Sequence, residues 1–239
     1  MKILNLNVIS KGRSIPWQFK VKRMINAGYV GRNLEEVKAH IEELKRYEIP
    51  PPSSVPMIFP ILSHNITTES RIEVIGSKTS GEVEYVLLLS RENVFVGVGS
   101  DHTDRDLESQ SIIKSKQICQ NVISRDIWKY EDVKSSWDDL LIQSWVKASD
   151  KDEEILYQKA SLGTIISAAE IMNLVKSKII DGEEDGLVIF SGTIPTVTNE
   201  IIHGSYFRSE LIDSRLKRSL TCEYQIKKLD YLKRGDKSE

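Results

Sequence analysis

The sequence is poor in the residues that form disulfides and thiolate metal sites. It contains two cysteines among 239 residues, Cys119 and Cys222, and their wide separation does not match the short spacing of a zinc site. So few cysteines favour a reducing compartment, and we therefore expect a cytoplasmic protein. A chain of this length can bury a stable core without disulfide bonds.

An excess of one charge and long apolar runs are also lacking. The 33 basic and 35 acidic residues nearly balance, and no dense basic patch occurs, which argues against a nucleic-acid partner. No stretch approaches the roughly 18 apolar residues of a membrane-spanning helix. The opening MKILNLNVIS also lacks the apolar segment and cleavage site of a signal peptide. We expect neither a nucleic acid nor a membrane as partner.

Hydrophobic periodicity predicts a β-rich chain with two main helices. Apolar residues spaced three and four apart predict an amphipathic helix over 34–49, with Asn33 as its N-cap and the prolines at 50–52 ending it. Ser167 and Glu170 have the spacing of a capping box at the start of a helix over 167–180. The segment 112–127 is ambiguous. Strands are expected over 1–10, 17–25, 56–62, 71–76, 140–148, 205–212 and 219–229, in a hairpin over 83–98, and within 182–192.

The hairpin over 83–98 carries carboxylates at its open end. Glu82 and Glu84 lie two residues apart on a strand, so they share a face. Apolar residues continue that face and also fill the other one, which is typical of a strand inside a sheet or sandwich. The apolar positions are Val83, Tyr85, Val86, Leu87, Leu88 and Leu89.

Counting across the turn predicts how the two strands pair. A four-residue turn over 90–93 places Leu89 opposite Val94, which in turn places Glu84 opposite Gly99 and Glu82 opposite Asp101. Like charges in direct pairs are destabilising, so a shared proton or a bound cation would be needed. Oxygen ligands without Cys or His favour Mg²⁺, Mn²⁺ or Ca²⁺. Alternatively, the three carboxylates could lie at a solvated hairpin end with Arg105 as their partner, and this explains their presence equally well.

A second pair of polar residues lies on the first predicted helix. His40 and Glu43 are three residues apart and therefore face the same way. A histidine oriented by a carboxylate can act as a general base, although this spacing is more often surface decoration. The flanking glycine-bearing loop and the prolines suit either an exposed lid or a plain surface helix.

Four short motifs follow one another along the chain. They are His40-Ile41-Glu42-Glu43, Glu82-Val83-Glu84, Asp101-His102-Thr103-Asp104-Arg105-Asp106, and DGLVIFSGTIPTV over 185–197. In this order they resemble the fumarylacetoacetate hydrolase superfamily, which has a lid helix with His-x-x-Glu, a Glu-x-Glu metal strand and an Asp-x-Thr/Ser-x-Arg-Asp motif. The superfamily's Thr-Gly-Thr-Pro loop has one more residue here. The chain most resembles an uncharacterised, divergent branch.

This resemblance implies a fold and a domain plan. The fold would be β-rich α+β, a mixed β-sandwich or β-roll with a short lid helix and one or two surface helices. Residues 1–239 would form one catalytic domain. Its parts would be N-terminal strands and the lid helix over 1–50, a metal-binding core over 51–230 and a solvated tail over 231–239.

The resemblance also implies roles for individual residues. Glu82, Glu84 and Asp101 would bind Mg²⁺, or alternatively Mn²⁺ or Ca²⁺. His40, Glu43 and Lys116 would be catalytic, with Lys114 a weaker candidate than Lys116. Thr193, Arg105 and Glu108 would contact the substrate, and Glu108 stands where many members have Gln.

The implied function is hydrolysis of a C–C bond in a 2-oxo acid or 1,3-dicarbonyl compound, such as an acylpyruvate, through an enolate that the metal stabilises. The partner would be a small carboxylate substrate, and the protein would be a homodimer. A lyase of the same fold is the alternative, either a 2-oxo acid decarboxylase, a hydratase or an isomerase. A non-catalytic metal or ligand binder also stays open, because fold does not fix reaction.

Overall fold

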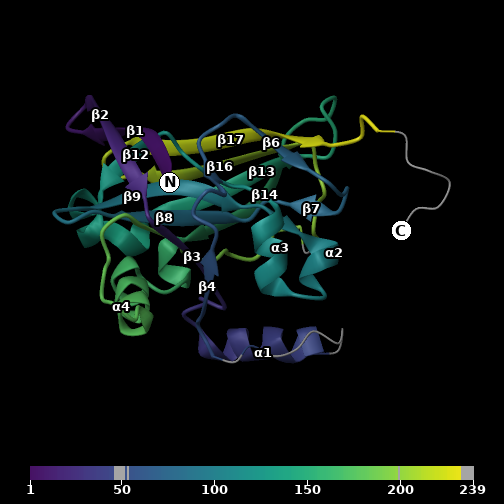
Figure 1. Cartoon of the computed structure of the whole chain (residues 1–239), viewed down its shortest axis with the longest axis horizontal. Coiled ribbons are helices and arrows are strands. Elements are labelled where there is room, and N and C mark those ends of the chain that lie inside the picture. The colour runs from purple at the N-terminus through teal and green to yellow at the C-terminus, as the bar shows by residue number, and fades with distance from the viewer. Residues whose placement is uncertain (46–51, 53, 199, 233–239) are drawn as a thin grey trace.

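The computed structural model describes residues 1–45, 52, 54–198 and 200–232. The predicted end of the first helix, over 46–49, and most of the predicted tail lie outside these residues. The described part is β-rich, with long strands in two sheets and a few short helices (Figure 1). This architecture confirms the predicted β-rich α+β fold.

The larger sheet has ten strands and contains the predicted hairpin at its centre. Eight of its strands follow the order β2-β1-β12-β9-β8-β15-β3-β4, and β11 joins β9 on one side and β5 on the other. The strands are β1 (Lys2–Ser10), β2 (Arg13–Val21), β3 (Arg23–Gly28), β4 (Met57–Ile61), β5 (Ile66–Thr67), β8 (Val83–Leu89), β9 (Val94–Asp101), β11 (Asn121–Ile123), β12 (Asp126–Lys129) and β15 (Leu187–Phe190).

A five-stranded sheet lies against one face of the larger sheet, with the order β14-β13-β16-β17-β6. Figure 1 shows β16 and β17 above β8 and β9. A two-stranded ladder joins β7 to β10. The bounds are β6 (Arg71–Val74), β7 (Thr79–Ser80), β10 (Thr103–Asp104), β13 (Leu141–Lys147), β14 (Ile155–Ser161), β16 (Tyr206–Asp213) and β17 (Arg218–Lys228).

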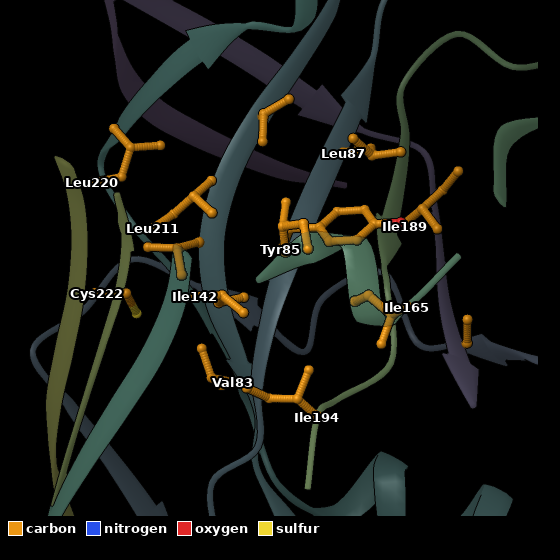
Figure 2. Packing of buried hydrophobic residues seen from close by; sticks show 14 of the residues in the cluster. Val83, Tyr85, Leu87, Ile142, Ile165, Ile189, Ile194, Leu211, Leu220 and Cys222 are labelled. Carbon is orange, nitrogen blue, oxygen red and sulfur yellow. The ribbon is translucent and has the colours of Figure 1, made fainter. Parts of the chain in front are cut away.

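Two apolar clusters cover the two faces of β8. Tyr85 and its alternate neighbours on β8 pack toward the five-stranded sheet, where Ile142 and Leu211 meet them (Figure 2). Val86 and Leu88 point the other way, into a second cluster that includes residues of β1, β2 and β3. A strand buried on both faces was expected from its continuous apolar run. The centre of the fold therefore holds β8 firmly on both sides.

Short helices complete the chain. Within the described residues the α-helices are α1 (Leu34–Lys45), α2 (Arg105–Glu108), α3 (Ile112–Ile118) and α4 (Ala168–Lys178), and the 3₁₀ helices cover Tyr130–Asp132, Lys134–Asp139 and Leu162–Thr164. Asn33 caps α1 as predicted, because its side-chain oxygen accepts the Glu35 amide at 3.1 Å. None of the described helices is both long enough and apolar enough to cross a membrane.

The prediction of one strand over 17–25 is wrong. The chain instead forms β2 and β3, which lie in different parts of the sheet and are separated by Lys22. The amides of Lys22 and Arg23 both bond to the carbonyl of Gly186, at 2.8 and 3.3 Å. Lys22 also pairs with Asp185 at 2.6 Å. Residues about 160 positions away in the sequence thus determine where β2 ends and β3 begins. A local apolar pattern does not indicate such contacts.

The ambiguous segment over 112–127 contains two kinds of structure. It begins with α3 and continues through β11 into the start of β12. The helix places Ser115 and Lys116 in buried positions and leaves Ile113 and Ile118 exposed. A buried lysine with exposed isoleucines reverses the usual amphipathic pattern, which explains why periodicity did not identify this helix.

We expect Ser167→Ala to lower the free energy of unfolding by about 1 kcal/mol, because α4 begins with a complete capping box. The Ser167 hydroxyl accepts the Glu170 amide at 3.3 Å, and the Glu170 carboxylate accepts the Ser167 amide at 2.7 Å. Urea denaturation measures the change. Ser177→Ala in the same helix is the control and should be neutral or slightly stabilising. Equal losses in both variants would contradict a special role for the cap.

Candidate metal centre

The structure confirms the predicted register of the β8–β9 hairpin. Leu89 pairs with Val94 and Glu84 pairs with Gly99. At the open end, the amide of Asp101 donates to the carbonyl of Glu82 at 3.1 Å. Gly99 leaves little free space, since an added Cβ would lie 2.4 Å from the Val122 carbonyl oxygen. The space that the missing side chain of Gly99 leaves beside Glu84 is therefore filled by the neighbouring strand.

This register brings three carboxylates together. One oxygen from each of Glu82, Glu84 and Asp101 lies within 4.8 Å of the others. Glu84 and Asp101 are buried, and the Glu82 side chain is 18% exposed. The alternative of a solvated hairpin end is therefore wrong, although its expected partner Arg105 does contact Glu82, at 3.1 Å.

Lys116 supplies the cation at the centre of this carboxylate cluster. Its ammonium forms a short ion pair with Asp101 and lies 3.5 Å from Glu82. Burial would lower the pKa of Lys116, but the charges of Asp101, Glu82 and Glu84 raise it above its ordinary value. The lysine therefore stays charged and holds the position of a counter-ion among the carboxylates.

The two glutamates differ in their protonation behaviour. Burial would raise the pKa of Glu82, but Arg105 and Lys116 together hold it below its ordinary value. Burial and the adjacent Asp101 raise the pKa of Glu84 well above its ordinary value, despite the opposing charge of Lys116. Glu84 therefore takes up a proton more readily than Glu82 does.

Backbone and side-chain amides also hold the carboxylates in place. Glu84 accepts the amide of Gly192 at 2.9 Å, and Asp101 accepts the side-chain amide of Asn121 at 3.2 Å. Gly192 has a φ of +83°, which favours glycine at the turn that presents this amide. The side-chain oxygen of Asn121 is buried and has no hydrogen-bond partner among the described residues. Sequence patterns gave no sign of Asn121, because β11 reaches the site only through pairing with β9.

Thr193 fixes the loop beside the cluster. Its hydroxyl donates to the Val83 carbonyl at 2.9 Å and accepts from the Gln158 side chain at 2.8 Å. Gln158 in turn accepts the Val83 amide at 3.0 Å. The hydroxyl proton of Thr193 is therefore occupied, and its predicted contact with a substrate remains a prediction. Gln158 was not identified from the sequence, because it joins the site from the other sheet.

Arg105 and Glu108 form a second ion pair beside the cluster, at 2.7 Å. Arg105 also donates to the Ser80 hydroxyl at 2.7 Å. Burial and the nearby charge of Glu108 raise the pKa of Tyr29, which follows β3 with a φ of +55°. A non-glycine residue in this backbone region is uncommon and often occurs at functional sites. The predicted substrate contacts of Arg105 and Glu108 remain predictions.

A buried histidine connects the cluster to the five-stranded sheet. The His102 ring lies 3.0 Å from the Tyr224 hydroxyl and 2.9 Å from that of Thr79. Tyr224 donates to the Ser100 hydroxyl, which accepts the Glu82 amide at 3.2 Å. Burial, followed by the charge of Arg105, lowers the pKa of His102 to about 3, so the ring is neutral near pH 7. This network positions the strand ends that carry Glu82 and Asp101.

The predicted general base lies on α1. The helix forms as expected, but the side chains of His40 and Glu43 lie outside the part of the structure that is described. Their catalytic role stays a prediction. Lys114, the weaker candidate for the lysine, is exposed, whereas Lys116 contacts the carboxylates.

The carboxylate cluster is suited to a hard divalent cation. Three converging carboxylates, with no Cys or His among them, form the donor set that Mg²⁺, Mn²⁺ or Ca²⁺ prefers. The ammonium of Lys116 pairs with two of these carboxylates, so the oxygens already accept one positive charge. A divalent ion would be held by Glu82, Glu84 and Asp101.

We expect Lys116→Met to destabilise the protein more without a divalent ion than with one. The substitution leaves buried carboxylates without their ammonium, and breaking a buried ion pair costs about 3–5 kcal/mol. A divalent ion that binds the folded state should recover part of this loss. Denaturant unfolding measures the free energy of unfolding once with a chelator and once with Mg²⁺. The control variant is Lys114→Met at an exposed position. If Lys116→Met lost the same free energy of unfolding with chelator as with Mg²⁺, the result would contradict a cation site here.

Comparisons with known proteins assign the fold. The 5-carboxymethyl-2-hydroxymuconate delta-isomerase from Mycobacterium smegmatis is 15% identical, with a TM-score of 0.63 over 91% of this chain and 86% of that one. Fumarylacetoacetate hydrolase from psychrophilic Exiguobacterium antarcticum is 14% identical, with a TM-score of 0.62 over 95% and 100%. A 2-keto-3-deoxy-D-arabinonate dehydratase complexed with magnesium and 2,5-dioxopentanoate is 14% identical, with a TM-score of 0.61 over 91% and 85%.

These similarities show a fold like that of fumarylacetoacetate hydrolase, as predicted. A search of curated proteins finds no match. The sequence does match a family of proteins of unknown function, DUF2848, over residues 27–224, a span that includes every predicted site residue. Since this match covers most of the chain, the protein belongs to the DUF2848 family.

Proposed function

We propose that the protein is a divalent-metal-dependent enzyme that hydrolyses a C–C bond in a 2-oxo acid or 1,3-dicarbonyl substrate resembling an acylpyruvate. The observation that carries this proposal is the buried group of Glu82, Glu84 and Asp101, with oxygens within 4.8 Å of one another. Burying Glu84 and Asp101 beside a third carboxylate is costly. A site for a cation and a small carboxylate would account for this arrangement.

The metal's contribution is electrostatic: a bound Mg²⁺, Mn²⁺ or Ca²⁺ ion would attract the carboxylate and neighbouring keto oxygen of the substrate and stabilise an enolate. We favour Mg²⁺ because one dehydratase of similar fold is complexed with magnesium. The protein side chains supply binding, orientation and proton transfer around this centre.

Lys116 would stabilise negative charge on the substrate. Its ammonium is buried beside Asp101 and Glu82, so an ion bound by these carboxylates would displace it from their oxygens and free it to face a developing oxyanion. Arg105 is held by Glu82 and Glu108 and would bind a substrate carboxylate from the same side. Thr193 would shape the substrate site through the loop that its hydroxyl anchors to the Val83 carbonyl.

His40 would act as the general base and Glu43 would orient its ring. The two residues are spaced for one face of α1, and the sequence resemblance assigns them this role. The ring would remove a proton from water, which would then attack the distal carbonyl of the substrate. This pair distinguishes the hydrolase from the alternative lyase, a decarboxylase, hydratase or isomerase of the same fold. Structures of similar fold include an isomerase and a dehydratase as well as a hydrolase.

We further propose that the chain is a divergent branch of the fumarylacetoacetate hydrolase superfamily. Four motifs in order and the shared fold support this assignment. In keeping with it, residues 1–239 would act as one catalytic domain in a cytoplasmic homodimer.

We expect Glu84→Gln to lower Mn²⁺ affinity at least tenfold and to abolish turnover, because it removes one of three anionic ligands while keeping the side-chain shape. Calorimetry with Mn²⁺ measures affinity, and a panel of acylpyruvates and oxaloacetate with Mg²⁺ or Mn²⁺ measures turnover. The control is Glu92→Gln in the exposed hairpin turn, which should leave both unchanged. Undiminished Mn²⁺ binding by Glu84→Gln would refute the assigned site.

We expect His40→Ala to lower turnover by at least about 100-fold while Mn²⁺ affinity stays within twofold, because the residue would transfer protons rather than bind the ion. The same calorimetric titration and substrate panel provide the two readouts. If His40→Ala and Glu43→Gln both leave turnover unchanged, the hydrolase assignment fails and the lyase remains. If the wild-type protein binds Mn²⁺ but turns over no member of the panel, the non-catalytic binder is favoured.

A further inference from the structure

One side-chain amide in contact with the carboxylate cluster is only half satisfied. Asn121 is fully buried on β11, and its nitrogen donates to Oδ1 of Asp101 at 3.2 Å. Its oxygen has no hydrogen-bond partner among the described residues. Buried polar atoms are nearly always paired, because leaving one without a partner is costly. The amide therefore has a defined contact with Asp101 and a free acceptor atom beside it.

Strand pairing brings the two side chains together. Asn121 and Asp101 are direct partners in the antiparallel pair of β11 and β9. Their backbone amides point away from each other, because Asp101 donates to the carbonyl of Glu82 and Asn121 donates to that of Asn65, both at 3.1 Å. Such a pair is the closely spaced kind, with Cα atoms about 4.5 Å apart. The contact between the amide and the carboxylate is thus fixed by the sheet itself.

The same register places the amide on the side of the sheet that carries the carboxylates. Gly99 pairs with Glu84 on β8 and with Ile123 on β11. Asp101 lies two residues after Gly99 on its strand, and Asn121 lies two residues before Ile123 on the other. Since side chains alternate along a strand, all of these positions share one face. The Asn121 amide and the carboxylates therefore point to the same side of the ten-stranded sheet.

The two oxygens of Asp101 have different partners. Oδ1 accepts the Asn121 amide, whereas Oδ2 forms the short ion pair with the Lys116 ammonium. The cation of this cluster is therefore bound at Oδ2, and the amide reserves Oδ1. A divalent ion that took the place of the ammonium would contact Asp101 through one oxygen, while the other stayed bonded to Asn121.

Binding through one carboxylate oxygen suits a small ion better than a large one. Mg²⁺ demands near-ideal octahedral geometry and usually keeps several waters, whereas Ca²⁺ takes about six to eight oxygens and often both oxygens of a carboxylate. The free oxygen of Asn121 fits the smaller ion as well, because a retained water is a hydrogen-bond donor that this buried acceptor otherwise lacks. Both halves of the amide therefore favour the same ion.

We propose that Asn121 is a positioning residue that makes the carboxylate cluster prefer Mg²⁺ to Ca²⁺. Its nitrogen holds Oδ1 of Asp101 and leaves Oδ2 for the ion, and its oxygen accepts a hydrogen bond from a water that the ion keeps. Partners of this kind orient metal ligands, and their loss costs about 10–100-fold in metal affinity. The inference rests on the proposed function, in which Glu82, Glu84 and Asp101 bind the ion.

A competition experiment on the full-length protein tests this preference. The protein is loaded with Mn²⁺, and the electron paramagnetic resonance signal of free Mn²⁺ reports its displacement by Mg²⁺ or by Ca²⁺. We expect Asn121→Leu to weaken Mg²⁺ binding at least tenfold and to change Ca²⁺ binding less than threefold, because the released carboxylate can offer both oxygens to the larger ion. The preference for Mg²⁺ should therefore fall, which a general loss of structure would not cause.

Two further variants control for damage to the fold. Asn121→Ala is the second test variant, and it removes the same amide without adding an apolar group. Asn65→Ala is the matched control, because this buried amide bonds to the Gln117 carbonyl at 2.6 Å rather than to a carboxylate. Any effect of Asn65→Ala should be equal for Mg²⁺ and Ca²⁺, so the ratio of the two affinities should stay at the wild-type value.

The outcomes separate this inference from the proposed function. If both Asn121 variants lose affinity for the two ions equally, bind neither ion, or keep the wild-type ratio, the selective role of Asn121 is refuted. The metal centre of the wild type stands in each of these cases. If the wild type itself binds none of Mn²⁺, Mg²⁺ and Ca²⁺, the proposed metal-dependent function fails, and the role of Asn121 fails with it.

Discussion

The meeting of three carboxylates, two of them buried, at one end of the β8–β9 hairpin constrains the structure around it. Like charges in a low-dielectric interior repel strongly, so the fold must supply compensating groups from elsewhere in the chain. Lys116 comes from α3 and Arg105 from α2, while Asn121 and Gly192 contribute amides from β11 and the loop after β15. Arg105, Lys116 and Asn121 follow Asp101 closely in the sequence, whereas Gly192 comes from a distant part of the chain. Even so, burial and the adjacent Asp101 keep the pKa of Glu84 above its ordinary value.

The two sheets hold this strained arrangement in place. β8 is buried on both faces, so its position is set by apolar packing well before the charged end is reached. The neutral His102 then links the end of β9 to Tyr224 of β17. Rigid support of this kind lets a site keep ligands in a fixed geometry, and preorganised charge is what enolate chemistry needs. The packing holds the strand that carries Glu84, whereas the proposed reaction would also depend on His40 and Glu43.

The sequence predicts the centre of the site better than its surroundings. The pairing of Glu84 with Gly99 followed from alternation and turn length alone, because both are local properties of one hairpin. The importance of Lys116 came from family resemblance, since a buried lysine on a helix with exposed isoleucines has no recognisable periodicity. The break at Lys22 and the contacts of Gln158 depend on partners distant in sequence.

The most direct test of the account is a crystal structure of the protein soaked with Mn²⁺, with anomalous scattering used to locate the ion. We predict one strong peak within about 2.5 Å of oxygens from Glu82, Glu84 and Asp101, and an ammonium of Lys116 displaced from its place among them. The absence of a peak at the cluster, with Lys116 still paired to Asp101, would contradict the claim that these carboxylates form a metal centre.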